Sequence, residues 1–159
     1  MNIQTFITIG AIILFGLLGV TLNRTISNAE QTKLYAESII TANSIAQNVI
    51  NEIKQKKFDK NVGDEITVNL SSLTPASQFG APQGRPASQF VAVEEYHNHK
   101  RTINTRRLGN FNVDVKISYV QENDFRLPSL TQTRTKEILV NVTNKYLIDT
   151  LKLRMYKTF

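Results

Sequence analysis

The stretch Ile3–Leu22, which reads IQTFITIGAIILFGLLGVTL, decides the fold of this chain. Its twenty residues are mostly apolar, and no charged side chain occurs between Asn2 and Asn23. A helix of that length crosses about 30 Å of hydrocarbon at about 1.5 Å per residue. Nothing basic precedes Ile3, and the end of the stretch, Val20–Arg24, is a poor cleavage site, so the stretch does not read as a cleaved secretory signal. We therefore expect a retained membrane-spanning helix.

The helical pattern continues beyond the apolar stretch. Six residues recur at spacings of 4, 3, 4, 3 and 4 and form one apolar stripe: Tyr35, Ile39, Ala42, Ala46, Val49 and Ile53. The other faces of this segment carry charged and amide side chains, and no proline occurs before Pro75. We expect one nearly continuous helix from about Ile3 to Phe58, whose six stripe residues form a core against a sheet.

The second half of the chain changes to the two-residue period of strands. In Phe111–Tyr119 apolar residues alternate with polar ones, and Thr135–Thr143 and Leu147–Tyr156 repeat this pattern. Ile66–Leu70 and Phe90–Val93 are weaker strand candidates. Consecutive strands with short connections favour an antiparallel sheet that is covered on one face by the amphipathic helix. The predicted fold class is α+β, with a long N-terminal helix packed on a small β-rich head.

These patterns divide the chain into three regions. We expect an apolar helix over residues 1–24, an amphipathic helix over 25–60 and a globular head over 61–159. Within the head, a Ser-, Pro- and Gly-rich stretch contains a short repeat, Pro75-Ala-Ser-Gln-Phe79 and Pro86-Ala-Ser-Gln-Phe90. We interpret this stretch as a surface loop whose ends are held by Phe79 and Phe90.

The composition gives little support for catalysis. The chain has no cysteine and only two histidines, His97 and His99, which lie close to Glu94 and Glu95. These four residues can be read as a metal cluster, but we interpret Tyr96–Lys100 as a polar loop. No phosphate-binding glycine loop, nucleophile elbow or His-Glu-x-x-His motif is present. We expect no enzyme activity, no catalytic residue, no metal site and no cofactor.

The net charge of +6 raises the question of an acidic partner. We interpret it as a solvated basic surface. The basic pairs Lys100-Arg101 and Arg106-Arg107 lack interleaved aromatic residues, so nucleic acid is not an expected partner. A glycan or another surface ligand stays open.

Three sugar-acceptor patterns occur, beginning at Asn23, Asn69 and Asn141. Asn23 borders the apolar stretch, and Asn141 lies inside a predicted strand. Asn69 is therefore the one plausible glycosylation site.

The order of these features resembles the type IV pilin and pseudopilin family. Ala42–Glu52, ANSIAQNVINE, is similar to a run on the helix of minor pilins and pseudopilins, which like this chain continues to a Phe-Asp pair, here Phe58-Asp59. Val93–His97, VEEYH, then resembles an acidic stretch of mannose-sensitive-haemagglutinin-type minor pilins. Two strand motifs follow in the family's order, Gly-x-Phe-x-Val at Gly109–Val113 and Lys-x-Ile-x-Val-x-Val at Lys136–Val142.

This resemblance implies a structural subunit of a pilus-like helical filament. The monomer would lie in the bacterial inner membrane, meet the pilus assembly machinery, and polymerise with itself into a cell-surface fimbrium used in cell adhesion. The family's usual glutamate at the fifth position is replaced by Thr5. In a bundle of apolar helices, Gln4 and Thr5 would hydrogen-bond to neighbours, and Gly10, Gly16 and Gly19 would set the spacing of the helices.

Two alternatives remain beside the filament subunit. The chain can be a minor pilin or pseudopilin that primes a pilus or a type II secretion system. It can also be a membrane-anchored binding protein whose head recognises a glycan, DNA or a protein partner.

Overall fold

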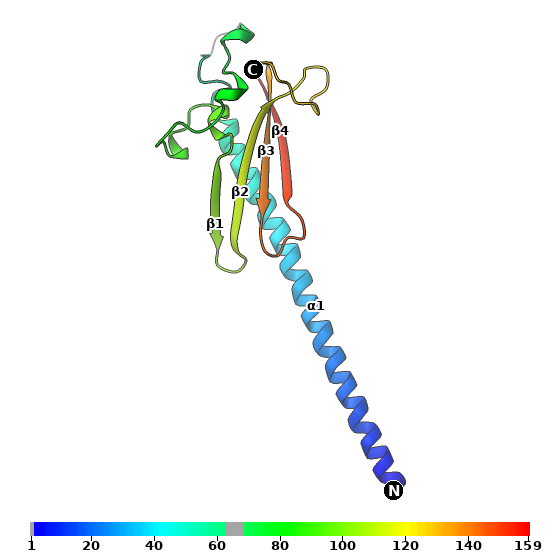
Figure 1. Ribbon diagram of the computed structural model, residues 1–159. Coiled ribbons are helices and arrows are strands. Elements are labelled where there is room, and N and C mark those ends of the chain that lie inside the picture. Colours follow the sequence, from blue (N-terminus) through cyan, green and yellow to red (C-terminus); the bar gives the residue numbers. More distant parts are fainter. Residues whose placement is uncertain (1, 63–68) are drawn as a thin grey trace. The chain divides into compact units, whose positions relative to one another are not determined.

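The computed structural model describes residues 2–62 and 69–159 of the chain (Figure 1). Its first element, α1, is an uninterrupted α-helix over Ile3–Lys54. The chain divides into two compact units, Met1–Glu37 and Ser38–Phe159. The second unit joins the last part of α1 to a sheet and its loops. The predicted α+β class is confirmed, and a long helix with an antiparallel sheet is consistent with a pilin-like fold.

The sheet contains four antiparallel strands in the order β1-β2-β3-β4, which is also their order along the chain. The strands are Lys100–Thr105 (β1), Gly109–Tyr119 (β2), Thr135–Thr143 (β3) and Leu151–Thr158 (β4). Such a meander needs only short connections, because each strand pairs with the next one. β2 and β3 are the inner strands, and β1 and β4 are the edges.

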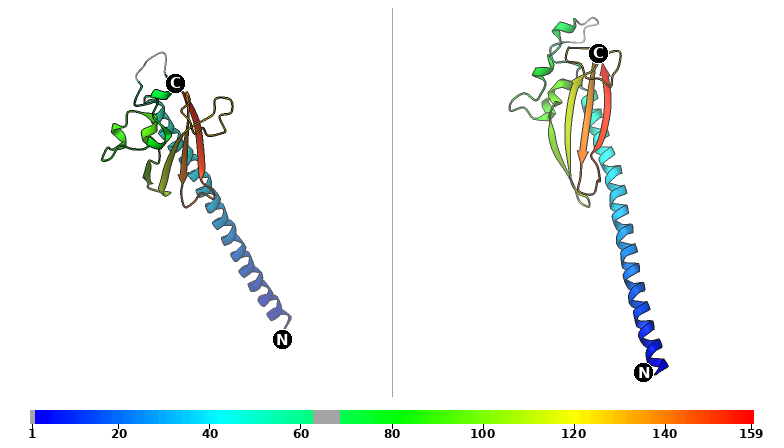
Figure 2. Two further views of the ribbon diagram at one scale, coloured as in Figure 1. Left: turned by 45° about the horizontal axis from the view of Figure 1, so that its top comes forward. Right: turned by 45° about the vertical axis from the view of Figure 1, so that its right-hand side comes forward.

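The core of the head lies between one face of this sheet and the last part of α1 (Figures 1 and 2). The alternating apolar residues of β2 and β3 that face α1 are buried: Phe111, Val113, Val115, Ile117, Tyr119, Ile138, Val140 and Val142. Full burial of one aliphatic or aromatic side chain contributes about 1.5–3 kcal/mol. The two-residue period therefore gives the sheet an apolar inner face and a polar outer face.

The helix ends at Lys54 and not at Phe58 as expected. The backbone of Lys57 is instead bridged to the segment around Ala92. The Lys57 N–H donates to Val91 O at 3.0 Å, and the Val93 N–H donates to Lys57 O at 3.0 Å. These two bonds take the place of helical ones, and they bring the buried Phe58 into the core of the head.

Three strand boundaries differ from the sequence prediction: the starts of β2 and β4, and the end of β4, which lies at Thr158 and not at Tyr156. β3 has its predicted bounds, whereas β2 begins at Gly109 and not at Phe111. β4 begins at Leu151 because a turn at Asn144 occupies the residues before it. Asn144 Oδ1 accepts from the Tyr146 N–H at 2.9 Å, and Asn144 O accepts from the Leu147 N–H at 3.1 Å.

The sequence prediction missed β1 altogether and proposed a strand that is absent. β1 is a largely polar edge strand, and its pairing with β2 follows a turn that closes at Gly109, where φ is 74°. In Phe90–Val93 only Ala92 makes a bridge, and a 3₁₀ helix spans Val93–Tyr96. Of the candidate strand Ile66–Leu70, residues 66–68 lie outside the described residues, and a 3₁₀ helix begins at Leu70.

The two copies of the Pro-Ala-Ser-Gln-Phe repeat have the same local structure. Each forms one 3₁₀ turn, over Ala76–Gln78 and over Ala87–Gln89. The phenylalanine that ends each copy turns inward, as predicted. The ring centroid of Phe79 lies 5.1 Å from that of Tyr119, and the ring centroid of Phe90 lies 4.9 Å from that of Tyr96.

Candidate assembly helix and its supporting head

We define the assembly segment as Ile3–Leu22, the apolar part of α1. Its large apolar side chains are between 46% exposed, at Ile9, and 80% exposed, at Ile3. Within residues 2–62 and 69–159, α1 is the one helix that is long and apolar enough to cross a membrane, and its apolar stretch is not buried. Apolar surface on this scale is unfavourable in water, so the segment needs lipid or protein around it.

The polar residues of the assembly segment suit such surroundings. Thr8 Oγ1 donates to Gln4 O at 2.8 Å, and Thr21 Oγ1 donates to Leu17 O at 2.9 Å. Bonds to the preceding helical turn satisfy a hydroxyl without water. The side chains of Gln4 and Thr5 are exposed in the first turn of α1, where a neighbouring helix can reach them.

The three glycines of the segment leave bare backbone on the helix surface. A Cβ atom added at Gly10, Gly16 or Gly19 would meet nothing within 4 Å. At about 100° of rotation per residue, Gly16 and Gly19 lie on adjoining faces and Gly10 lies opposite Gly19. Small residues on more than one face suit a helix that packs closely against several neighbours.

The stripe of six residues is only partly buried. Ala42, Ala46, Val49 and Ile53 are 0–2% exposed and belong to the core of the head. Tyr35 and Ile39 are each 36% exposed and are not core residues, because the buried residues of α1 begin at Ser38. The expectation that all six form one helix–sheet core is corrected to these four.

The segment interpreted as a polar loop, Tyr96–Lys100, forms the turn between the 3₁₀ helix Val93–Tyr96 and β1. Tyr96 is 1% exposed, and Lys100 begins β1. Asn98 has a φ of 59°, and its N–H donates to Val115 O at 2.8 Å. Backbone hydrogen bonds of Asn98 and His99 to Val115 therefore hold this turn against β2.

The four residues that can be read as a metal cluster have separate partners. Glu95 Oε2 accepts from the Val91 N–H at 2.6 Å, and His97 Nδ1 lies 2.7 Å from Ile117 O. The His99 ring packs 5.5 Å from that of Phe90, and burial lowers its pKa, helped by the nearby charge of Arg101. Among the residues that the structure describes, no three His, Cys, Asp or Glu side chains are grouped to hold a metal ion.

Glu94 belongs to a buried ion cluster, which we define as Asp59, Glu94 and Lys136. Lys136 Nζ lies 2.8 Å from Asp59 Oδ2 and 2.9 Å from Glu94 Oε2, and it donates to Phe58 O at 2.7 Å. All three side chains are at most 1% exposed. The cluster therefore ties together the turn after α1, the 3₁₀ helix Val93–Tyr96 and β3.

Further polar groups complete the buried ion cluster. Thr74 donates to Asp59 through its N–H at 3.0 Å and through its hydroxyl at 2.8 Å, and the Tyr119 hydroxyl donates to Thr74 O at 2.8 Å. Burial opposes ionisation of Asp59, but the bond to Lys136, its positive charge and the bonds from Asn61 and Thr74 hold the Asp59 pKa below its usual range. Burial and the nearby carboxylates raise the pKa of Tyr119.

A second polar contact fixes α1 to the head from another side. The Tyr96 hydroxyl donates to Glu52 Oε1 at 2.9 Å, and Arg101 Nη1 donates to Glu52 Oε2 at 3.1 Å. Burial, and then the hydrogen bond to Glu52, raise the pKa of the Tyr96 hydroxyl. One carboxylate of α1 thus holds both the 3₁₀ helix and β1.

Asn69, the candidate glycosylation site, is exposed. Its side chain caps the 3₁₀ helix Leu70–Ser72, because Asn69 Oδ1 accepts from the Ser71 N–H at 3.2 Å and from the Ser71 hydroxyl at 2.9 Å. The side chain that a sugar would modify is therefore also the side chain that caps this 3₁₀ helix.

Comparisons with protein-family models, with curated proteins and with solved structures gave no match.

Proposed function

We propose that this chain is a structural subunit of a pilus-like helical filament and that it does not act as an enzyme. The observation that carries this proposal is the assembly segment. It is exposed and charge-free, and it is continuous within α1 with residues that form the core of a folded head. A structural role is also supported by the buried ion cluster, whose polar groups are occupied by contacts within the head.

The proposed mechanism is a transfer between two apolar surroundings. As a monomer, the subunit would hold its assembly segment in the bacterial inner membrane. In the filament the segment would be surrounded by the same segment of other subunits, and the heads would cover the outside. Contacts between helices in such a bundle come from close packing and from hydrogen bonds of polar side chains. Close packing would be permitted by Gly10, Gly16 and Gly19. The hydrogen bonds would be supplied by Gln4 and Thr5.

Thr5 in place of the family's usual glutamate is compatible with this mechanism. A carboxylate inside an apolar bundle is costly unless it is paired. An uncharged pair such as Gln4 and Thr5 avoids that cost, although it also gives up the strong directional pairing that a charge provides. We propose that close packing carries most of the assembly energy here.

The motifs that resemble minor pilins support a second candidate within the same family. In that role the chain would prime a pilus or a type II secretion system and would occupy few positions in the filament. Immunogold labelling against the head distinguishes the two roles, because a main subunit is labelled along the whole filament and a priming subunit at one end.

Electron microscopy of material sheared from cells that express the chain tests the proposal. We expect uniform filaments from the full chain and a non-polymerising head from a variant that lacks Met1–Asn23. Filaments or oligomers of the truncated head would show that the heads carry assembly. If the full chain is found only in membranes and forms no filament, a membrane-anchored binding protein becomes the better account.

A further inference from the structure

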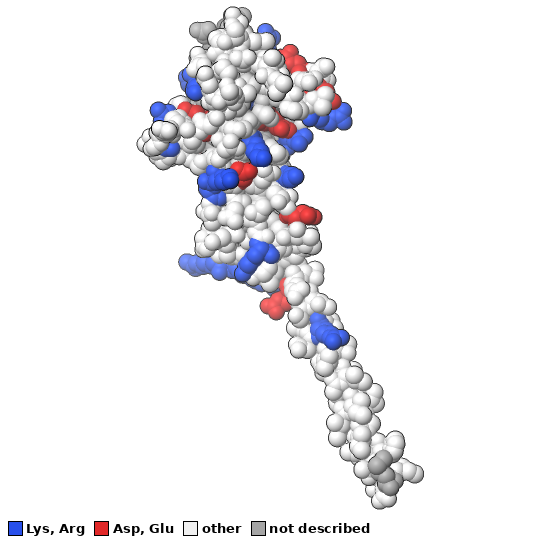
Figure 3. Space-filling model, in the orientation of Figure 1, with Lys and Arg blue, Asp and Glu red and all other residues white. Residues whose placement is uncertain are grey.

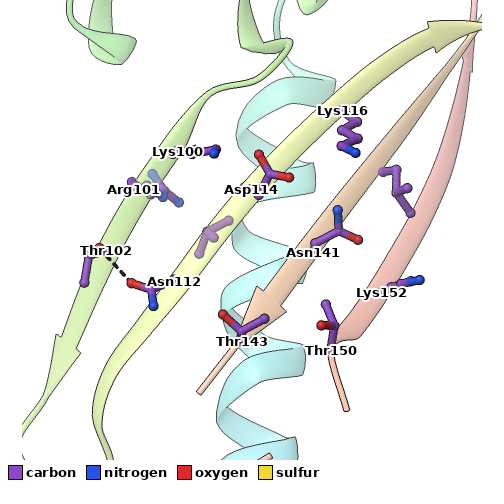
Figure 4. Close-up of a pocket in the computed structure, with 12 residues that line it drawn as sticks. Lys100, Arg101, Thr102, Asn112, Asp114, Lys116, Asn141, Thr143, Thr150 and Lys152 are labelled. Carbon is purple, nitrogen blue, oxygen red and sulfur yellow. Dashed lines mark hydrogen bonds between the residues drawn. The ribbon is translucent and has the colours of Figure 1, made fainter. Parts of the chain in front are cut away.

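The outer face of the sheet, which is turned away from α1, carries an open groove (Figure 4). We call it the sheet-face groove. Its lining includes Lys100 and Thr102 of β1, Asp114 and Lys116 of β2, Asn141 of β3 and Lys152 of β4. A second, smaller hollow lined by Asn and Lys residues shares two lining residues with it and so extends it along the same face. Polar side chains from all four strands therefore meet in one place.

Strand register places four of these residues in a single row across the sheet. Lys100 pairs with Asp114, Asp114 with Asn141, and Asn141 with Lys152. At about 4.8 Å between strands, the row is about 14 Å long. Its two ends carry ammonium groups, and its centre carries two short side chains with oxygen acceptors. The strand register therefore fixes the order of the row: a cation, two acceptors and a second cation.

The two acceptors at the centre of the row lack donors. Asp114 Oδ1 and Asn141 Oδ1 are both buried, and neither accepts a hydrogen bond from another group of the chain. Buried polar atoms in folded proteins nearly always have a partner, which water or a ligand supplies where the chain itself does not. The exposed lysines around them have long, rotatable side chains that can move aside without a change in the backbone. A ligand with hydroxyl donors would satisfy both oxygens.

The charge around the groove favours an anionic ligand. Figure 3 shows several Lys and Arg side chains on the side of the head that is turned toward the viewer, with fewer Asp and Glu side chains among them. Lys100, Lys116 and Lys152 line the groove, and Asp114 is its one acidic lining residue. Leu139 adds an apolar surface to the lining. The groove thus offers ammonium groups for an acid, acceptors for hydroxyls and an apolar contact for a carbon skeleton.

We propose that the sheet-face groove binds a carboxylated oligosaccharide, a chain that contains uronic acid units. The sugar hydroxyls donate to Asp114 Oδ1 and Asn141 Oδ1, and the sugar carboxylates accept from the lysines at the rim. A DNA strand fits the same groove less well, because its phosphodiester backbone has no hydroxyl donors for Asp114 Oδ1 and Asn141 Oδ1. The site lies entirely within the head, so it goes beyond the filament role and does not depend on polymerisation.

The test is a calorimetric titration of the full chain in phosphatidylcholine nanodiscs. Three uronate probes are used: an oligomer of galacturonate, an oligomer of mannuronate, and an oligomer whose repeating disaccharide contains glucuronate. A neutral galactose oligomer lacks the acid, and polyphosphate and single-stranded DNA lack hydroxyl donors along the backbone. We expect at least one uronate oligomer to bind more tightly than all three controls.

Asp114→Leu separates a built site from simple charge attraction. This variant removes an acceptor and also raises the net positive charge, so a polyanion held by charge alone binds it more tightly than the parent. We expect the opposite, a loss of about tenfold in uronate affinity for Asp114→Leu, and a similar loss for Asn141→Leu. Thermal unfolding of both variants should match that of the parent, because neither side chain belongs to the apolar core.

A matched pair of lysine variants completes the experiment. Lys152→Gln should weaken uronate binding several-fold, whereas Lys33→Gln, which removes the same charge outside the groove, should change it by less than about twofold at physiological salt. The proposal is overturned if no uronate oligomer binds, or if Asp114→Leu binds uronate as tightly as the parent. Tighter binding of DNA than of every uronate oligomer would assign the groove to nucleic acid and would also overturn it.

Discussion

Lys136 Nζ lies 2.8 Å from Asp59 Oδ2, and neither side chain is exposed to solvent. The two residues come from β3 and from the turn that follows α1, and Glu94 completes the contact from a third segment. Buried ions are costly unless they are paired and hydrogen-bonded. Here each carboxylate also accepts backbone N–H bonds, from Thr74 to Asp59 and from Lys60 to Glu94. The turn that follows α1 is therefore held in the head by polar contacts as well as by apolar packing.

Replacing Lys136 with Met should strongly destabilise the head. The change leaves Asp59 and Glu94 buried without their cation, and loss of one partner of a buried ion pair typically costs about 3–5 kcal/mol. Urea unfolding of the full chain in detergent, followed by the circular dichroism of the tyrosines, measures the free energy of unfolding. Lys136→Met combined with Asp59→Asn and Glu94→Gln should recover part of the loss. If the combined variant is no more stable than Lys136→Met, the unpaired buried charges are not the cause of the destabilisation.

Asp59 should give the head a stability that falls in acid. Its pKa in the folded head is below the ordinary value of 3.8, so the folded state binds a proton less readily than the unfolded chain does. The stabilisation by ionised Asp59 is then complete above pH 3.8 and is lost as the pH falls through the lower, folded-state pKa. An Asp59→Asn variant lacks this contribution at every pH.

The comparison of the parent with Asp59→Asn measures that contribution. The difference between their free energies of unfolding should be constant from pH 7 to about pH 5 and should shrink below pH 3.8. A difference that stays the same down to pH 2 would mean that Asp59 has the same pKa in the folded head as in the unfolded chain, and would contradict the lowered pKa.

Ala46→Asp should unfold the head, because Ala46 is 0% exposed at the contact between α1 and the sheet. An unpaired carboxylate at that position costs several kcal/mol, at least about 3. The matched control is Gln47→Asp, which introduces the same residue next to it on an exposed face of α1. We expect Gln47→Asp to lower the melting temperature only slightly. Equal melting temperatures for the two variants would contradict the placement of α1 on the sheet.

The elements that the sequence predicts best are those with a strong period. β2 and β3 alternate apolar and polar residues, and α1 carries a charge-free stretch followed by an apolar stripe. β1 has no such period, because Lys100–Thr105 is an edge strand with an exposed outer face and only Ile103 as a large apolar residue. The pairing with β2, and not the composition of β1 itself, makes this segment a strand.

The sequence analysis did not predict the buried ion cluster. Asp59, Glu94 and Lys136 are far apart along the chain, and each is a residue type that usually faces water. One usable signal was present, since Lys136 occupies an inward position by the alternation of β3, next to the buried Thr135. The sheet-face groove has no sequence signal at all, because its row of four residues depends on the register of three strand pairs.

The central claim is that the assembly segment packs in a bundle of helices and does not serve only as an anchor. Gly16→Leu fills bare backbone on the helix surface, and Gln4→Leu removes a side chain that would hydrogen-bond to a neighbour. Both variants remain apolar enough to enter a membrane. Contacts of this kind are worth about 0.6 kcal/mol on average and at most about 2, but a filament repeats them in every subunit.

The most direct measurement is the filament yield of these two variants, obtained by shearing and sedimentation, beside their membrane insertion, obtained by fractionation. Leu14→Ile is the control, because it exchanges one large apolar side chain for another within the same segment. We predict that all three variants insert like the parent, that Leu14→Ile polymerises normally, and that Gly16→Leu and Gln4→Leu each give far fewer filaments. If Gly16→Leu and Gln4→Leu insert and polymerise like the parent, the assembly segment is not packed against its neighbours and the account is contradicted.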